Sequence, residues 1–307
     1  MGRALRCAAM GVPLLFLAAC DEFDFGNFDR YKEDFHYTYP LAAGGRLSLE
    51  NLNGSVEISG WEKDSVEING TKFANSEQTL KETKIDVSSS PNVVQVRTIP
   101  AFGPRGAGAR YSIRVPHRVQ LDRIVSSNGG IRIEDIEGTV NLRTSNGTIR
   151  IWRINGSLEA RTSNGSIEAT GQTGNAVTHT SNGSVRIEMS KGALEAGTSN
   201  GSITARLTQP DAQLPVRLES SNGHIDLTLD AVREVRANTS NSSITVHLPD
   251  GANARVRART SNSSITTEFD VLTRGMIGKH SLDGTLGTGG PLIDLSTSNS
   301  SIKILKL

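Results

Sequence analysis

The chain has 307 residues, of which 36% are hydrophobic and only 5% aromatic, so a broad helical core of Leu and Phe is not expected. Its formal net charge of +1 argues against a nucleic-acid partner, which requires a basic surface. Ser, Thr, Asn and Gly are abundant, and this composition is typical either of disorder or of the turns of a repetitive β structure. Regularly recurring Ile and Val favour the β structure.

The first 20 residues predict export and attachment to a membrane. Arg3 and Arg6 precede an apolar segment of the length found in secretory signals. The segment ends in the tetrapeptide LAAC, which resembles the bacterial lipobox, where cleavage precedes a cysteine that is acylated. We therefore expect residues 1–19 to be a lipoprotein signal peptide and Cys20 to be the lipidated residue that holds the protein at the membrane. An ordinary signal peptide with a chance cysteine is the alternative.

A tether and a capping section are predicted to follow the anchor. Residues 20–34 are interpreted as the lipidated cysteine and its tether, and residues 35–125 as an N-terminal β section. Phe35, Tyr37 and Tyr39 alternate with polar residues, which is the period of a β-strand. Further β-like segments lack a fixed repeat. Such a section would begin the fold and cover an open sheet edge.

Residues 126–307 carry an internal repeat. Each copy reads Ser or Thr, then Ser-Asn, then Gly or Ser, one variable residue, and Ile or Val. The repeated asparagines are Asn128, Asn146, Asn164, Asn182, Asn200, Asn222, Asn241, Asn262 and Asn299. The first four spacings are 18 residues, and the long spacing before Asn299 suggests one degenerate turn.

Each repeat predicts two strands around a turn. Leu158, Ala160 and Thr162 alternate with charged residues before the turn, and Ile167 and Ala169 do so after it. Antiparallel hairpins would satisfy this alternation. However, an identical side chain at the same turn every 18 residues favours an all-β, single-stranded parallel β-helix, or β-solenoid, with coils of about 18 residues. We expect the asparagines to stack as an amide ladder and to adopt the left-handed conformation at this corner.

Two further segments carry a family resemblance. Residues 53–61, Asn-Gly-Ser-Val-Glu-Ile-Ser-Gly-Trp, and the Ser-Leu-Asp-Gly-Thr-Leu run from Ser281 flank the repeat array. Together with the array they resemble the bacterial DUF4097 family of adhesin-like proteins, over about residues 35–307. The resemblance implies a β-solenoid on an exported or membrane-anchored protein and brings no catalytic residues. The last three copies depart from the family pattern by having Ser after the Asn.

One set of outward residues is a candidate binding site. Arg143, Arg161 and His179 recur at 18-residue intervals and would form a basic stripe on adjacent coils, suited to acidic glycans or lipid headgroups. A solvated face of mixed charge is the alternative. The six histidines are scattered, so no metal site is predicted. The sequence also has no cofactor-binding or catalytic motif.

The sequence thus predicts a lipid-anchored cell-envelope protein that acts as a non-catalytic scaffold or adhesin-like binding module, with an envelope protein or a glycan as its partner. Whether the anchor lies in the inner membrane, the outer membrane or the cell surface is left open. Two alternatives are an envelope sensor or regulator that docks onto another membrane protein, and a glycan-active β-helix enzyme. Carboxylates clustered on one outer face would favour the enzyme.

Overall fold

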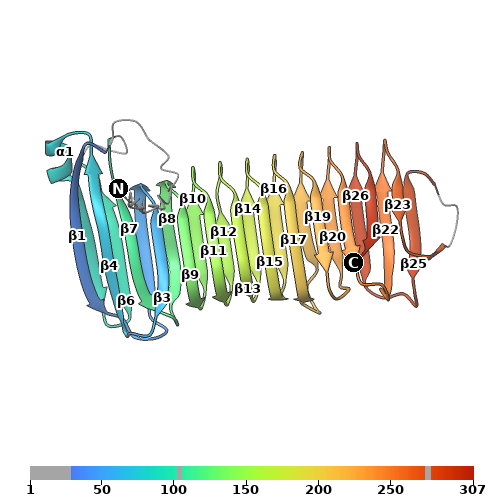
Figure 1. Ribbon diagram of the computed structural model, residues 1–307, viewed down its shortest axis with the longest axis horizontal. Coiled ribbons are helices and arrows are strands. Elements are labelled where there is room, and N and C mark those ends of the chain that lie inside the picture. Colours follow the sequence, from blue (N-terminus) through green and yellow to red (C-terminus); the bar gives the residue numbers. More distant parts are fainter. Residues whose placement is uncertain (1–28, 102–105, 274–277) are drawn as a thin grey trace, which may run out of the picture.

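The computed structural model describes residues 29–101, 106–273 and 278–307, which form one elongated solenoid (Figure 1). The expected signal peptide, Cys20 and most of the expected tether therefore lie outside the described residues. Among the described residues, no helix is both long and apolar enough to cross a membrane.

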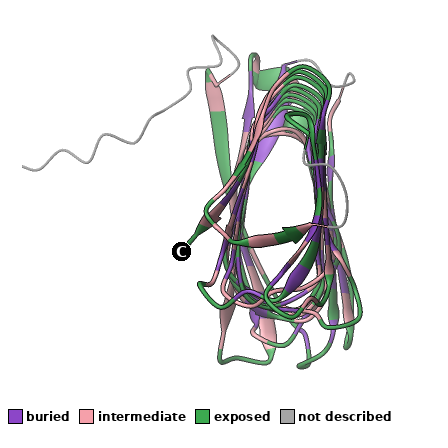
Figure 2. Cartoon of the chain, turned by 90° about the vertical axis from the view of Figure 1, so that its right-hand side faces the viewer, coloured by how far each residue is buried: buried purple, intermediate pink, exposed green. Residues whose placement is uncertain are grey.

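Two long sheets run along the molecule and face each other across the core (Figure 2). Within the described residues, sheet A has 13 strands, in the order β1 (Tyr31–Pro40), β4 (Ser65–Ala74), β7 (Ala107–Pro116), β3 (Val56–Trp61), β9 (Ile131–Glu137), β11 (Ile149–Asn155), β13 (Ile167–Thr173), β15 (Val185–Gly192), β17 (Ile203–Pro210), β19 (Ile225–Leu229), β21 (Ile244–Leu248), β27 (Ile302–Lys306) and β23 (Ile265–Thr267).

Sheet B has 14 strands over the same described residues. Their order is β24 (Val271–Thr273), β25 (Ser281–Leu286), β22 (Ala254–Thr260), β26 (Leu292–Thr297), β20 (Val235–Thr239), β18 (Val216–Ser220), β16 (Leu194–Thr198), β14 (Ala176–Thr180), β12 (Leu158–Arg161), β10 (Val140–Thr144), β8 (Gln120–Asn128), β2 (Arg46–Asn53), β6 (Val93–Ile99) and β5 (Lys84–Ser90). The helix α1 (Glu77–Glu82) packs beside the first end of sheet A.

Each central coil contributes one strand to each sheet, and successive coils pair in parallel and in register. Ile149 pairs with Ile167, which pairs with Val185, so residues 18 apart lie directly above one another. These side chains point between the sheets and are at most 1% exposed. The core is therefore a stack of thin aliphatic layers, and the predicted all-β solenoid is confirmed.

The two corners of a coil differ in shape (Figure 2). The repeated Ser-Asn turns form the tight corner, called here the Asn corner. At this corner a Cβ built on Gly165 would lie 1.9 Å from the carbonyl oxygen of Gly147, so glycine permits close stacking of the coils. Left-handed glycines occur at the opposite corner, where Gly174 has φ 109° and Gly192 has φ 125°. No asparagine of the column has a positive φ, so the expected left-handed asparagine is wrong.

A buried hydroxyl column supports the Asn corner from inside. Thr180 Oγ1 donates to the carbonyl oxygen of Gly165 in the preceding coil at 2.8 Å, and Thr162 Oγ1 does the same to Gly147 at 3.0 Å. Both threonines are buried. The hydroxyls therefore satisfy inward carbonyl groups that the strands leave unpaired.

At both ends the coils do not stack in chain order. The last coil, formed by β26 and β27, lies between the coil of β20 and β21 and the coil of β22 and β23. It pairs in parallel with both. Residues between Asn262 and Asn299 supply the short antiparallel strands β24 and β25 instead of the expected degenerate turn. At the first end, β2 and β3 lie between β6/β7 and β8/β9.

Antiparallel strands close the first end of the solenoid. Strand β4 pairs with β7, β1 pairs with β4, and β5 pairs with β6. Phe35, Tyr37 and Tyr39 on β1 lie in a row and pack against the core, with ring centroids 5.8 Å and 6.4 Å apart. Aromatic side chains thus cover the end of a core that is otherwise aliphatic.

Candidate binding surfaces

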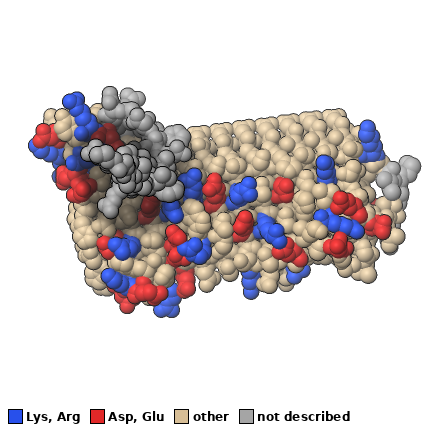
Figure 3. All heavy atoms as spheres, in the orientation of Figure 1, with Lys and Arg blue, Asp and Glu red and all other residues tan. Residues whose placement is uncertain are grey.

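The asparagine column forms a continuous ladder. From Asn128 onward each Nδ2 donates to the Oδ1 of the preceding asparagine in the column, and Asn164, for example, donates to Asn146 at 2.8 Å and accepts from Asn182 at 2.7 Å. In spatial order the ladder contains Asn53, Asn128, Asn146, Asn164, Asn182, Asn200, Asn222, Asn241, Asn299 and Asn262. Most of these side chains are exposed. Figure 3 shows the resulting upper edge as largely free of charged residues.

The predicted stripe lies in a groove on the outer face of sheet B. Arg143, Arg161 and His179 are consecutive register partners on β10, β12 and β14, at the strand spacing of about 4.8 Å. The groove has a volume of about 740 Å³. Serines that precede the ladder asparagines form one wall, and Arg123 lines the groove from the bulge of β8, whereas Val125 is the register partner of Arg143. Sequence reasoning missed Arg123 because the position 18 residues before Arg143, which is this register partner in β8, is Val125.

Charges in the groove are unequally paired. Glu159 Oε1 accepts a hydrogen bond from Arg161 Nε at 2.8 Å, and Glu50 Oε1 lies 3.2 Å from Arg123 Nε. Arg143 is exposed and has no acidic partner among the described residues. The His179 ring folds over Gly197, where an added Cβ would lie 2.5 Å from its Cε1 atom. The centre of the groove therefore offers an uncompensated guanidinium group.

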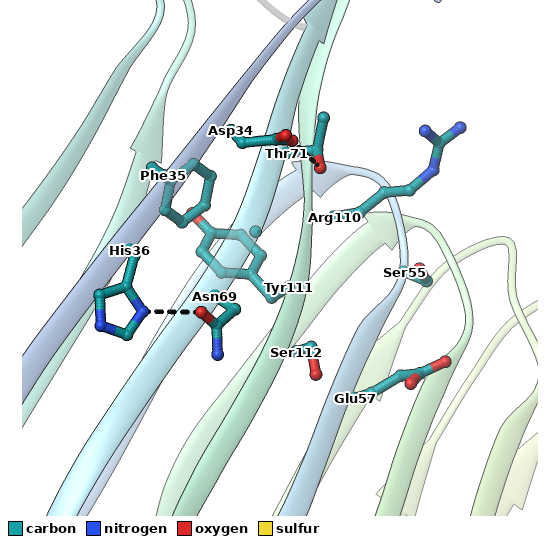
Figure 4. A pocket seen from close by; sticks show the side chains of 11 residues that line it. Asp34, Phe35, His36, Ser55, Glu57, Asn69, Thr71, Arg110, Tyr111 and Ser112 are labelled. Carbon is teal, nitrogen blue, oxygen red and sulfur yellow. Dashed lines mark hydrogen bonds between the residues drawn. The ribbon is translucent and has the colours of Figure 1, made fainter.

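A second depression lies on the outer face of sheet A, across β1, β4, β7 and β3 (Figure 4). It has a volume of about 600 Å³. Thr71 Oγ1 donates to Asp34 at 2.7 Å, and His36 Nδ1 lies 2.7 Å from Asn69 Oδ1. Sequence reasoning missed this depression, because its walls come from strands that are distant in sequence, and β4 pairs antiparallel with both β1 and β7.

The two carboxylates of this depression come from strands that are not neighbours in the sheet. Asp34 and Glu57 lie on β1 and β3, which are separated by two intervening strands, so their backbones are about 14 Å apart. Across the described ranges, no three His, Cys, Asp or Glu side chains are grouped so as to hold a metal ion.

Cations cover both tryptophans on the outer face of sheet A. The Arg132 guanidinium lies 4.6 Å from the ring centroid of Trp152, and Lys63 Nζ lies 4.7 Å from that of Trp61. Such cation–π contacts stabilise an exposed ring and occupy its face.

Two neighbouring residues on this face have left-handed backbones. Asp135 has φ 59° and Arg153 has φ 53°, one coil apart. Arg153 Nε donates to Asp135 Oδ1 at 2.6 Å, and Nη2 donates to Oδ2 at 2.8 Å. These hydrogen bonds hold the pKa of the Asp135 carboxyl below its ordinary value. The ion pair thus bridges two strained positions.

No family model and no curated protein matches the chain. Among solved structures, it is similar to a "putative cell adhesion protein" from Clostridium sporogenes, with 10% identity, a TM-score of 0.25 and coverage of 90% of this chain and 100% of that one. It is also similar to a "putative adhesin" from Bacteroides fragilis, with 11% identity, a TM-score of 0.29 and coverage of 90% and 97%.

A "putative lipid binding protein" from Parabacteroides distasonis is similar at 9% identity and a TM-score of 0.38, with coverage of 89% of this chain and 96% of that one. All three TM-scores lie below 0.5, so the assignment of the fold rests on the strand pairing of this chain.

Proposed function

We propose that the protein is a lipid-anchored, non-catalytic binding module of the cell envelope, related to the DUF4097 family, and that the sheet B groove binds an acidic glycan. The observation that carries this proposal is Arg143, an exposed cation without an acidic partner in the described chain, in a groove that is also lined by Arg123, Arg161, His179 and the acidic Asp122 and Glu159. An anionic ligand would complete its charge pairing.

The shape of the groove favours a linear ligand. Arg143, Arg161 and His179 lie one per coil along the solenoid axis, so a polymer with regularly spaced carboxylates could contact several coils at once. The serine wall adds hydroxyl groups that can bind sugar hydroxyls.

The binding proposal is tested with polygalacturonate, which carries one carboxylate per sugar, and with neutral dextran as the comparison. The chain should bind polygalacturonate more tightly, and added salt should weaken the binding. Arg143→Ala should lower the affinity about tenfold, because hydrogen bonds to charged groups contribute about 1.5 kcal/mol or more. Arg186→Ala removes an exposed arginine of sheet A and is the matched control. Equal affinities for the two polymers, or no effect of Arg143→Ala, would refute the proposal.

The anchor is tested separately with Cys20→Ser. This substitution should abolish labelling by a fatty acid and release the protein from membranes into the soluble fraction, while binding of polygalacturonate by the groove stays unchanged. Labelling that persists in the variant would contradict the lipidation of Cys20.

A further inference from the structure

The C-terminal coil is an insert rather than an end. Strand β26 pairs in parallel with β20 on one side and β22 on the other, and β27 pairs with β21 and β23. Its four inward side chains, Ile293, Leu295, Ile302 and Ile304, are fully buried. The chain must therefore leave a slot one coil wide after β21 and return to fill it with its last residues.

The slot is shaped for this coil. Leu295 lies between Ala237 and Ala258 in the same column, so a large side chain stands between two small ones. If β22 stacked directly on β20, the two alanines would be neighbours and the volume of a leucine side chain would be missing from the layer. The slot thus favours residues 292–307 over closure by the flanking coils.

The inserted coil also resembles its two neighbours at the Asn corner. Ser242, Ser263 and Ser300 replace the corner glycine in three coils that are adjacent in space, and these coils carry the last three copies of the repeat. In the glycine coils, a Cβ built at this position would lie 1.6–2.1 Å from the carbonyl oxygen of the coil before. The corner must change where serine replaces glycine, and the inserted coil belongs to the block with the changed corner.

A glycine-rich turn connects the insert to β25. It comprises residues 287–291, Gly-Thr-Gly-Gly-Pro, in which Gly287 has φ 55° and Gly289 has φ 85°. Asn253 Oδ1 accepts from the Thr288 amide at 2.7 Å and from its hydroxyl at 3.0 Å, which fixes the turn in its folded form. Opened, these five residues would span about 17 Å.

We propose that residues 292–307 exchange between two copies of this chain, each copy filling the slot of the other. Every contact of the insert would be retained in such a dimer, because the slot and the segment are unchanged. The monomer and the dimer then differ only in the conformation of the turn and in the entropy of association. The dimer therefore forms when residues 292–307 are detached from their slot while the protein concentration is high.

The test shortens the turn in the full chain. Deletion of Gly289 and Gly290 leaves too few residues to reverse the chain between β25 and β26, which favours exchange. We expect light scattering to give twice the mass of the monomer, with the far-UV circular dichroism of the wild type. Deletion of Ala212 and Gln213 from an exposed loop is the control and should leave the mass unchanged. A folded monomer of the shortened chain would overturn the proposal.

A second measurement uses the wild-type chain, so it tests the exchange of residues 292–307 even if the shortened chain does not fold. Two full-length chains with different tags are unfolded together and refolded at a concentration of several hundred micromolar. Exchange predicts that purification through either tag also recovers the chain that carries the other tag. The mixed dimer should persist after dilution, because each slot is filled by the segment of the other chain. Leu295→Asp in both chains should abolish this co-purification. Absence of mixed species for the wild type would overturn the proposal.

Discussion

Two threonines on one strand give a sharp test of the hydroxyl column. Thr178 and Thr180 both lie on β14, both point into the core, and are 0% and 1% exposed. Thr180 Oγ1 donates to Gly165 at 2.8 Å, whereas Thr178 Oγ1 is buried without a hydrogen-bond partner in the described chain. Valine has almost the shape of threonine, so replacing each by valine removes the hydroxyl and little else.

The two substitutions should have opposite signs. Thr180→Val removes a hydrogen bond and leaves the Gly165 carbonyl without this donor, which should destabilise the fold by about 1–3 kcal/mol. Thr178→Val removes an unpaired buried hydroxyl and should stabilise it, by up to about the same amount.

The measurement is the thermal unfolding midpoint of each variant. A change of 1 kcal/mol shifts this midpoint by about 2–4 °C in a domain of about 150–250 residues. The midpoints of the two variants should therefore differ by several degrees, with the Thr178 variant above the wild type. Equal losses in both variants would refute the assignment of the hydroxyl bonds and the inward register of β14.

Three further predictions concern other parts of the solenoid. Gly165→Ala places a methyl group 1.9 Å from a carbonyl oxygen and should cost about 1–3 kcal/mol in unfolding free energy, whereas Gly251→Ala meets open space and should change it by less than about 0.5 kcal/mol. Arg153→Gly relieves a left-handed backbone but removes the partner of Asp135. The lowered pKa of Asp135 stabilises the fold above the carboxyl's unfolded pKa, and this contribution is lost as the pH falls through the folded pKa. In acid, the difference in unfolding free energy between wild type and variant should therefore shift in favour of the variant, and a pH-independent difference would contradict the pairing. Asn164→Asp loses a ladder donor and should cost about 0.5–1.5 kcal/mol at pH 7, less at low pH; an unchanged melting midpoint would show that the ladder does not stabilise the fold.

The repeat predicts the interior of the central coils well, because period-two alternation fixes which side chains point inward. Ile149, Ile167 and Val185 lie in one buried column for this reason. The direction of Thr162 follows from the same alternation, but its bond to the carbonyl of the coil before requires the distance between coils, which the sequence does not contain.

The order of the terminal coils cannot be read from the repeat. The copies at Asn241, Asn262 and Asn299 have the same letters from Asn to Ile, so local pattern does not distinguish which copy pairs with which. The choice depends on packing, as at Leu295 between its alanines. The stripe of Arg143, Arg161 and His179 follows from spacing alone, whereas the depression in sheet A depends on antiparallel pairing of distant strands.

The positions of the two tryptophans affect how unfolding can be followed. Trp61 and Trp152 are the only tryptophans of the chain, and both lie in its first half under cationic side chains. Fluorescence therefore reports on the coils near the first end, whereas far-UV circular dichroism reports on every strand. Because coils of a solenoid contact only their neighbours, the second half can unfold while the emission spectrum stays native. Dichroism that falls before the emission shifts would locate the first loss of structure in the coils beyond Trp152.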